Sequence, residues 1–308
     1  MIDNLAFDFA FDPAKQNTLF RPCTSVVKKA KPFKNQLLKW IGNKQRVAHE
    51  IIGYFPNNFK IYHEPFLGSG GVLGVLSPNN GFASDSFKPL IGIWTTLKNN
   101  PQELKNWYSV RWNRMMFGNK VEEYEKIKAA YNASPNAADL LFLSRSCYGG
   151  VVRFRKIDGY MSTPCGIHEP IHPTSFEKRV DQWHFRVKGI KFAHIEFEEA
   201  MMRAKKDDII YCDPPYSFTQ AILYGAQSFS LERLFEVIAE CKARGIYVAL
   251  SIDGSKKSGN FLCEIPLPEN LFEREIPVNC GRSMLRRFQM EGKTLESEIV
   301  TDRLLLTY

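Results

Sequence analysis

The sequence lacks the marks of a secreted or membrane-spanning protein. Its seven cysteines are odd in number and contain no C-x-x-C pair, so no disulfide framework is predicted. No apolar run approaches the roughly 20 residues that a membrane-crossing helix needs. The N-terminal stretch MIDNLAFDFAFDP carries acidic residues where a secretory signal would avoid them. These absences predict free thiols and a soluble protein located in the cytoplasm.

Internal repeats and low-complexity segments are also missing. The 308 residues are 44% hydrophobic, enough for one large α/β domain or for a core domain with an insertion. The net charge of +8 indicates a polyanionic partner. Charge alone leaves nucleic acid, acidic membranes and acidic proteins open.

Short apolar runs alternate with helical patterns along most of the chain. Strands are expected at 60–66, 81–85, 191–197, 208–213, 247–252, 272–278 and 299–308. Helices are expected at about 44–55, from 72, in two or three segments between 86 and 131, and at 139–148 and 230–244. The last of them would be capped by Ser230. The alternation predicts a mostly parallel α/β sheet. Residues 149–191 show little helical pattern and are expected to form a loop-and-hairpin insertion.

A glycine-containing turn follows the first predicted strand. The strand ends in Glu64, Pro65 and Phe66, and the turn contains Gly68 and Gly70. Ligands of open α/β sheets bind outside the carboxyl ends of the strands, and glycine lets the backbone approach a ligand closely. The spacing is only G-x-G, so a plain tight turn explains it equally well.

The second predicted strand ends in Asp85. A carboxylate at this place can accept hydrogen bonds from ribose hydroxyls, and it can equally cap the following helix. Taken together with the glycine turn, Asp85 favours a cofactor that contains a nucleoside.

The order of four motifs resembles one enzyme family. KW-x-G-x-K at 39–44, EPF-x-G-x-G at 64–70, Asp85 and DPPY at 213–216 follow the pattern of the Dam-type (D12 class) adenine-specific DNA methyltransferases. The likeness continues through LFLSRSCYGGVVRFRKIDGYMSTPCG (141–166), SFSLERLFEVIAE (228–240) and VTDRLLLTY (300–308). It covers the chain from about residue 36 to the end.

The resemblance implies a Rossmann-like methyltransferase fold that binds S-adenosylmethionine. The expected cofactor-binding residues are Trp40, Gly42, Lys44, Glu64, Pro65, Phe66, Gly68, Gly70, Asp85 and Asp213. The family usually has Asn after the second-strand Asp, whereas this chain has Ser86. Ser86 therefore changes the local hydrogen-bonding groups, whereas Asp85 itself matches the family pattern.

The motif Asp213-Pro214-Pro215-Tyr216 fits the chemistry that the resemblance implies. An adenine amino group is a poor nucleophile because its lone pair is delocalised into the ring. Acceptors aimed at its hydrogens, here Asp213 and the Pro214 carbonyl, would stabilise the positive charge that develops on nitrogen. Tyr216 would stack on a base extruded from the duplex. The alternative is a proline-rich turn that merely ends a strand.

A basic segment follows the predicted helix 139–148. Between residues 145 and 191, nine Lys or Arg residues stand against four Asp or Glu residues, with aromatic residues interleaved. Beside a methyl-transfer site this composition favours DNA target recognition, although a solvated basic surface would look the same. A second cluster, GRSMLRRF (281–288), is a candidate DNA-facing loop. The expected DNA-binding residues are Arg145, Tyr148, Arg153, Arg155, Lys156, Arg282, Arg286 and Arg287.

These observations predict a methyltransferase that acts on N6 of adenine in duplex DNA. The catalytic domain is expected at 34–98 and 190–308, the target-recognition insertion at 99–189 and an N-terminal extension at 1–33. YMSTPCG (160–166) replaces the FNVPFG of family members that read GATC, so a different target sequence is expected. Methylation of cytosine N4, methylation of RNA and a catalytically silent DNA-binding protein of the same fold remain alternatives.

Two further expectations concern partners and metals. By analogy, a separately encoded restriction endonuclease is a second expected partner, and the protein is expected to be a monomer or a weak dimer. His168 and His172 have a ligand-like spacing, but Pro170 lies between them and no third ligand is evident. No metal site is therefore predicted.

Overall fold

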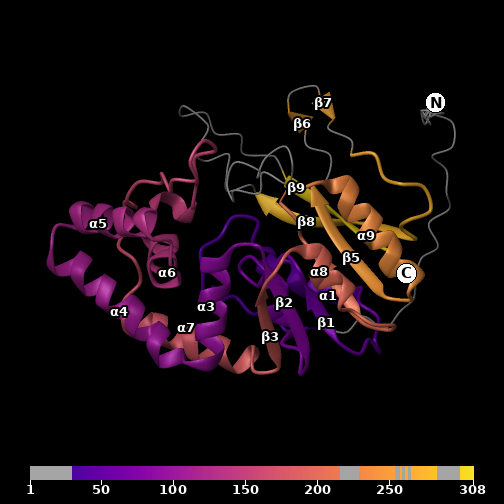
Figure 1. Cartoon of the computed structure of the whole chain (residues 1–308), viewed down its shortest axis with the longest axis horizontal. Helices are drawn as coiled ribbons and strands as arrows, with labels where there is room; N and C mark the ends of the chain where they lie inside the picture. Colours follow the sequence, from indigo (N-terminus) through magenta and orange to yellow (C-terminus); the bar gives the residue numbers. More distant parts are fainter. Residues whose placement is uncertain (1–29, 216–228, 254–256, 259–260, 263–264, 283–298) are drawn as a thin grey trace, which may run out of the picture.

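A mixed β-sheet lies at the centre of the computed structural model (Figure 1). The structure describes residues 30–215, 229–253, 257–258, 261–262, 265–282 and 299–308. Within these residues the main sheet has seven strands in the order β3-β2-β1-β4-β5-β9-β8. Their bounds are β1 Tyr62–Glu64, β2 Gly81–Asp85, β3 Ile190–His194, β4 Ile209–Cys212, β5 Tyr247–Asp253, β8 Arg274–Arg282 and β9 Ile299–Leu306. Strands β1 to β5 pair in parallel, and β9 pairs antiparallel with both β5 and β8. The prediction of a mostly parallel sheet is confirmed, as are all seven predicted strands. A separate pair, β6 Lys257–Ser258 and β7 Phe261–Leu262, is antiparallel.

The central strands are apolar because both faces of the sheet are covered. All four residues of β4 are buried, which is typical of a parallel strand with helices on each side. Successive side chains of a strand point to opposite faces. Ile210 and Cys212 accordingly pack in one hydrophobic cluster with α9, whereas Ile209 and Tyr211 belong to a second cluster on the other face.

Two helical segments, η2 and α1, precede β1, and further helices connect the strands. Their bounds are η2 Lys44–Arg46, α1 Ala48–Gly53, α2 Gly71–Leu76, α3 Lys88–Asn99, α8 Phe197–Met202 and α9 Leu231–Ala243. The predicted cap of α9 is confirmed, since Ser230 Oγ accepts a hydrogen bond of 3.1 Å from the Arg233 amide. Among the described residues, none of the helices is both long and apolar enough to cross a membrane.

Four further helices form a lobe beside the sheet (Figure 1). They are α4 Pro101–Phe117, α5 Lys120–Ala133, α6 Ala137–Ser146 and α7 Pro173–Arg186, with a single turn η3 at Tyr148–Gly150. Helix α6 matches the helix predicted at 139–148.

Helix α7 corrects the prediction that residues 149–191 form only loops and a hairpin. Pro173 starts the helix, and the side chain of His172 caps it by accepting a hydrogen bond from the Thr174 amide. Phe176, Val180 and Trp183 are fully buried and recur at the i, i+4, i+7 spacing of one helix face. Charged residues between them hid this pattern in the sequence.

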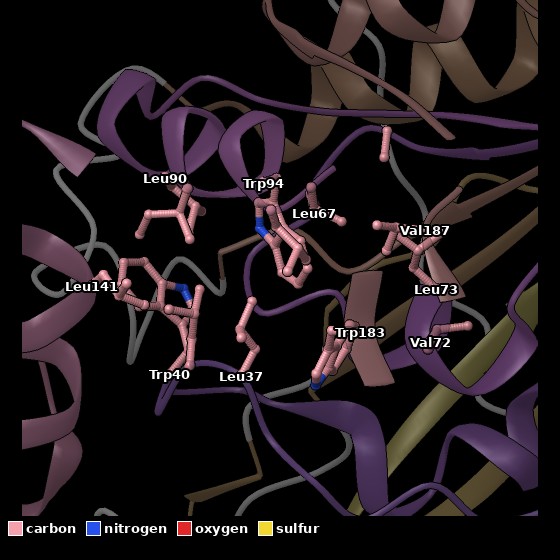
Figure 2. Close-up of a cluster of buried hydrophobic side chains, with 14 of the residues drawn as sticks. Leu37, Trp40, Leu67, Val72, Leu73, Leu90, Trp94, Leu141, Trp183 and Val187 are labelled. Atoms are coloured by element: carbon pink, nitrogen blue, oxygen red, sulfur yellow. The ribbon is translucent and has the colours of Figure 1, made fainter. Parts of the chain in front are cut away.

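The helical lobe and the sheet share one hydrophobic core. Trp94 of α3 and Trp183 of α7 lie with their ring centroids 5.3 Å apart. Figure 2 shows these rings among Leu37, Leu73 and other buried side chains from both parts. The boundaries predicted for the catalytic domain and its insertion stay predictions, because the packing is continuous across them.

Gly74 of α2 tests this packing. A Cβ atom there would lie 2.3 Å from the ring of Trp183, whose indole nitrogen is held by the Asn35 carbonyl at 2.7 Å. We expect Gly74→Ala to lower the free energy of unfolding by about 1–3 kcal/mol through overpacking, although alanine favours a helix by about 1 kcal/mol. Urea denaturation measures the change.

The combination of Gly74→Ala with Trp183→Phe is the control. The smaller ring makes room for the methyl group, so the two substitutions should cost less together than the sum of their separate effects. Strict additivity, or an unchanged stability in Gly74→Ala, would contradict this packing argument.

Candidate functional site

A cavity of about 640 Å³ lies where β1, β2 and β4 end. The chain continues from β1 toward β2 on one side, and from β4 toward β5 on the other. In open α/β sheets such a reversal of strand order creates a crevice for ligands. The cavity is lined by most of the residues predicted to bind a cofactor: Trp40, Gly42, Lys44, Glu64, Pro65, Phe66, Gly68, Asp85 and Asp213.

The glycine turn after β1 forms one wall of this cavity. Gly68 and Gly70 have φ values of +48° and +61°, a left-handed conformation that favours glycine. Gly68 lines the cavity. A Cβ atom on Gly70 would instead lie 3.0 Å from the ring of Trp94. Gly70 therefore shapes the turn by packing, and it is not among the lining residues.

Asp85 ties the end of β2 to the glycine turn. Its carboxylate accepts one hydrogen bond of 3.0 Å from the Gly68 amide and another of 3.0 Å from the Phe87 amide. Burial raises the pKa of Asp85 to about 6. Asp85 thus lines the cavity and holds the backbone at Phe87, which is the N-cap residue of α3. The alternative that Asp85 itself caps the helix is not confirmed, because α3 has no side-chain cap.

Glu64 is a buried acid at the end of β1. Its side chain accepts hydrogen bonds from the Tyr62 hydroxyl at 2.6 Å and the Leu73 amide at 3.1 Å. Burial raises the pKa of Glu64 to about 8, and the neighbouring charge of Asp213 also contributes. Near neutral pH the protonated form of Glu64 therefore predominates.

A buried ion pair joins η2 to the residue that follows β4. Lys44 Nζ lies 2.8 Å from Asp213 Oδ1 and 3.4 Å from Asp302 Oδ2 of β9. The side chains of Lys44 and Asp302 are only 6% and 8% exposed. Sequence reasoning missed the place of Asp302 in the site. Its one signal is the pair of charged residues, Asp302 and Arg303, directly before the apolar run 304–306 of β9.

Aromatic residues from three places complete the cavity. Phe66 stacks on Phe197 with ring centroids 5.2 Å apart, and Phe229 contacts Phe66 edge-on at 5.8 Å. Sequence reasoning also missed Phe197 and Phe229. Further lining residues come from the helical lobe and the hairpin: Tyr131, Asn132, Pro135, Phe154, Asp158, Gly159 and Tyr160.

The predicted hairpin is present between η3 and α7. Phe154 pairs with Met161, and the amide of Arg155 donates to the Tyr160 carbonyl at 2.9 Å. Arg153, Arg155 and Lys156 are exposed, and Tyr148 is 40% exposed.

Arg155 is held within the hairpin. It forms an ion pair with Asp158 at 2.5 Å and lies over the Tyr160 ring at 4.3 Å.

The placement of Arg145 contradicts the prediction that it contacts DNA. The residue is 5% exposed, and its Nη1 donates to the carbonyls of Gln36 and Leu37 at 3.1 and 2.9 Å. A guanidinium enclosed in this way fixes the chain before η2, and its charge does not reach the surface.

The remaining predicted residues differ in how far the structure describes them. Pro214 is buried after β4, and Pro215 lines the cavity. Arg282 ends β8, but its side chain lies outside the described part of the structure. Tyr216, Arg286 and Arg287 lie outside the described residues altogether.

Comparisons with known proteins agree on one family. The profile of the D12 class N6 adenine-specific DNA methyltransferases matches residues 40–277. A DNA adenine methylase from Vibrio cholerae is 29% identical over 234 residues, which covers 70% of this chain and 79% of that protein.

More distant relatives extend the comparison. A type II methyltransferase from Lactococcus lactis is 24% identical, covering 76% of this chain and 83% of that protein. The DNA N-6-adenine-methyltransferase of Escherichia phage P1 is 26% identical, covering 74% of this chain and 31% of that protein. A solved rRNA methyltransferase from Streptomyces viridochromogenes aligns over 85% of this chain and 83% of that chain, with a TM-score of 0.33 and 12% identity. At that TM-score the alignment carries no argument about the fold.

The raised pKa of Glu64 makes the stability depend on pH. The pKa is about 8 in the folded chain against an ordinary value of 4.5. The contribution of Glu64 to stability is therefore fully present below pH 4.5 and is lost as the pH rises toward 8. In Glu64→Gln this loss is absent. We expect the free energy of unfolding of the variant to gain on the wild type by up to about 1.4 kcal/mol per pH unit in this range.

Chemical denaturation across this pH range measures the difference. Glu240→Gln, a change at an exposed site of α9, is the matched control and should track the wild type at every pH. A constant difference between Glu64→Gln and the wild type would refute the raised pKa.

Proposed function

Because the chain belongs to the D12 class N6 adenine-specific DNA methyltransferase family, we propose that it transfers a methyl group from S-adenosylmethionine to N6 of adenine in duplex DNA. The site of transfer is a short specific sequence, and the reaction takes place in the cytoplasm. The observation that carries the proposal is the convergence of Asp213, Glu64 and Asp85 on one cavity at the carboxyl edge of the sheet.

The cavity suits S-adenosylmethionine as the donor. Asp85 is available to ribose hydroxyls, and the rings of Phe66 and Phe197 offer an apolar wall for a purine. The carboxylate of Asp213 suits a sulfonium cation by charge, whereas Glu64, which is mostly protonated near neutral pH, offers a neutral polar group. When bound, S-adenosylmethionine supplies an electrophilic methyl group. The protein's part is to orient the donor and to exclude water.

Asp213 acts on the adenine amine. Its carboxylate accepts a hydrogen bond from the amino group and stabilises the positive charge that forms on nitrogen as the bond to the methyl carbon forms and the bond from that carbon to sulfur breaks. A neutral thioether is left, and the methylated amine releases one proton to solvent. The Pro214 carbonyl is the second acceptor, and the prolines keep backbone N–H donors away from the reacting amine. Tyr216 stacks on the extruded base.

The hairpin is the proposed DNA-recognition element. Arg153, Arg155 and Lys156 are exposed beside the cavity, where cations reach phosphates and base edges. Arg155 has to exchange its ion pair with Asp158 for a DNA contact. By analogy with the type II relative, we also propose that the protein modifies DNA alongside a separately encoded restriction endonuclease.

Replacement of the central acceptor tests the proposed reaction. We expect Asp213→Ala to abolish methyl transfer, because the amine loses the group that stabilises its developing charge, while duplex binding stays nearly unchanged. Expression in a methylation-deficient host, followed by long-read sequencing that detects N6-methyladenine, reports the activity. The wild type should leave one recurrent methylated motif.

Asp181→Ala is the control for this experiment. Asp181 is exposed on α7 and pairs with Lys105, away from the lining residues of the cavity, so its loss should leave the methylated motif intact. Near-normal methylation by Asp213→Ala would remove Asp213 from the mechanism, and unmodified DNA with the wild type would remove the function.

The hairpin makes a separate prediction about salt. We expect Lys156→Ala to weaken binding to all duplexes and to reduce the slope of log affinity against log salt by about 0.9, the value for one lost phosphate contact. Fluorescence anisotropy at several salt concentrations measures this slope. Lys60→Ala is the control, because Lys60 precedes β1 at the opposite edge of the sheet and pairs with Asp207. Equal slopes for Lys156→Ala and the wild type would place phosphate binding elsewhere.

A further inference from the structure

Lys44 lies between two acids that belong to different strands. Asp213 follows β4 and lines the cavity, whereas Asp302 reaches the ammonium group from β9 and does not line the cavity. Strand β9 runs antiparallel to β5, with Asp302 opposite Asp253, the last residue of β5. The antiparallel strand thus places a carboxylate from its middle at the edge where β5 ends.

The distances indicate that the two acids share one cation. Asp213 is the closer partner at 2.8 Å, and Asp302 lies at 3.4 Å. A buried ammonium needs compensating charge. A tight pair with Asp213 alone would occupy an oxygen and draw electron density away from the carboxylate. With the Asp302 carboxylate nearby, the positive charge of Lys44 remains balanced while Asp213 accepts a hydrogen bond from the adenine amine.

The charge of this group also matters for the reaction. One ammonium and two carboxylates carry a net charge of −1, and the neighbouring Glu64, with a pKa of about 8, adds little negative charge near neutral pH. The amine becomes positive during methyl transfer. A remaining negative charge beside the cavity favours that change, and without Asp302 it would be cancelled.

We propose that Asp302 is a positioning residue for methyl transfer, which holds Lys44 so that Asp213 remains an effective acceptor for the adenine amine. This inference rests on the proposed function and adds to it a residue of β9 that is not among the predicted site residues. Asp302 acts through Lys44 and has no contact with the substrate.

Asp302→Asn and Asp302→Glu test the inference as a matched pair. The asparagine keeps the shape and removes the charge, so kcat should fall about 10- to 100-fold. The dissociation constants of donor and duplex, measured by calorimetry and anisotropy, should change by less than about threefold. The glutamate keeps the charge and should restore most of kcat. A structural role would instead lower the melting temperature and donor binding in parallel with kcat.

A double-mutant cycle tests whether Lys44 transmits the effect. In a Lys44→Met background the ammonium is gone, so the additional change Asp302→Asn should alter kcat by less than about threefold. An undiminished effect in that background would overturn the route through Lys44. A wild-type kcat in Asp302→Asn, or parallel losses of stability and donor binding, would overturn the inference.

The wild-type arm separates this inference from the proposed function. If the unmodified protein transfers no methyl group from S-adenosylmethionine to adenine in any duplex, the proposed function fails and the inference fails with it. If the wild type is active and Asp302→Asn is equally active, only the inference fails.

Discussion

Parallel strand pairing is the constraint on which the site depends. Because β1, β2 and β4 run in the same direction as neighbours, their final residues meet at one edge of the sheet. Glu64, Asp85 and Asp213 lie at or just beyond these ends, and no local segment would bring them together. Burial of the three acids is made tolerable by hydrogen bonds from Tyr62 and backbone amides and by the ammonium of Lys44.

Packing of large aromatic residues keeps that edge in shape. Trp94 contacts the glycine turn through its hydrogen bond to the Gly68 carbonyl at 3.1 Å, and its ring packs on Trp183 of the helical lobe. The turn that forms one wall of the cavity is therefore held by residues from α3 and α7. Because protein interiors are close-packed, a substitution in the buried part of the helical lobe is expected to shift the glycine turn.

The sequence predicted what local patterns determine. All seven strands of the sheet, the glycine turn and the acids at the strand ends followed from apolar runs and short motifs. Helix α7 was missed because its buried face has only Phe176, Val180 and Trp183 among charged residues. Arg145 was misplaced because composition does not distinguish a surface cation from one enclosed by backbone carbonyls. Asp302, Phe197 and Phe229 escaped because their approach to the cavity depends on the tertiary arrangement.

The turn of the hairpin has a consequence for how this protein can change over evolution. Asp158, Gly159 and Tyr160 belong to the proposed reading element and also line the cavity. If this hairpin were replaced by that of a homologue with another target sequence, the surface that contacts DNA would change. The walls of the cavity proposed to bind S-adenosylmethionine would change with it. A new target specificity is therefore expected to arise by coordinated substitutions in the hairpin and in the cavity wall, and less readily by exchange of the hairpin alone.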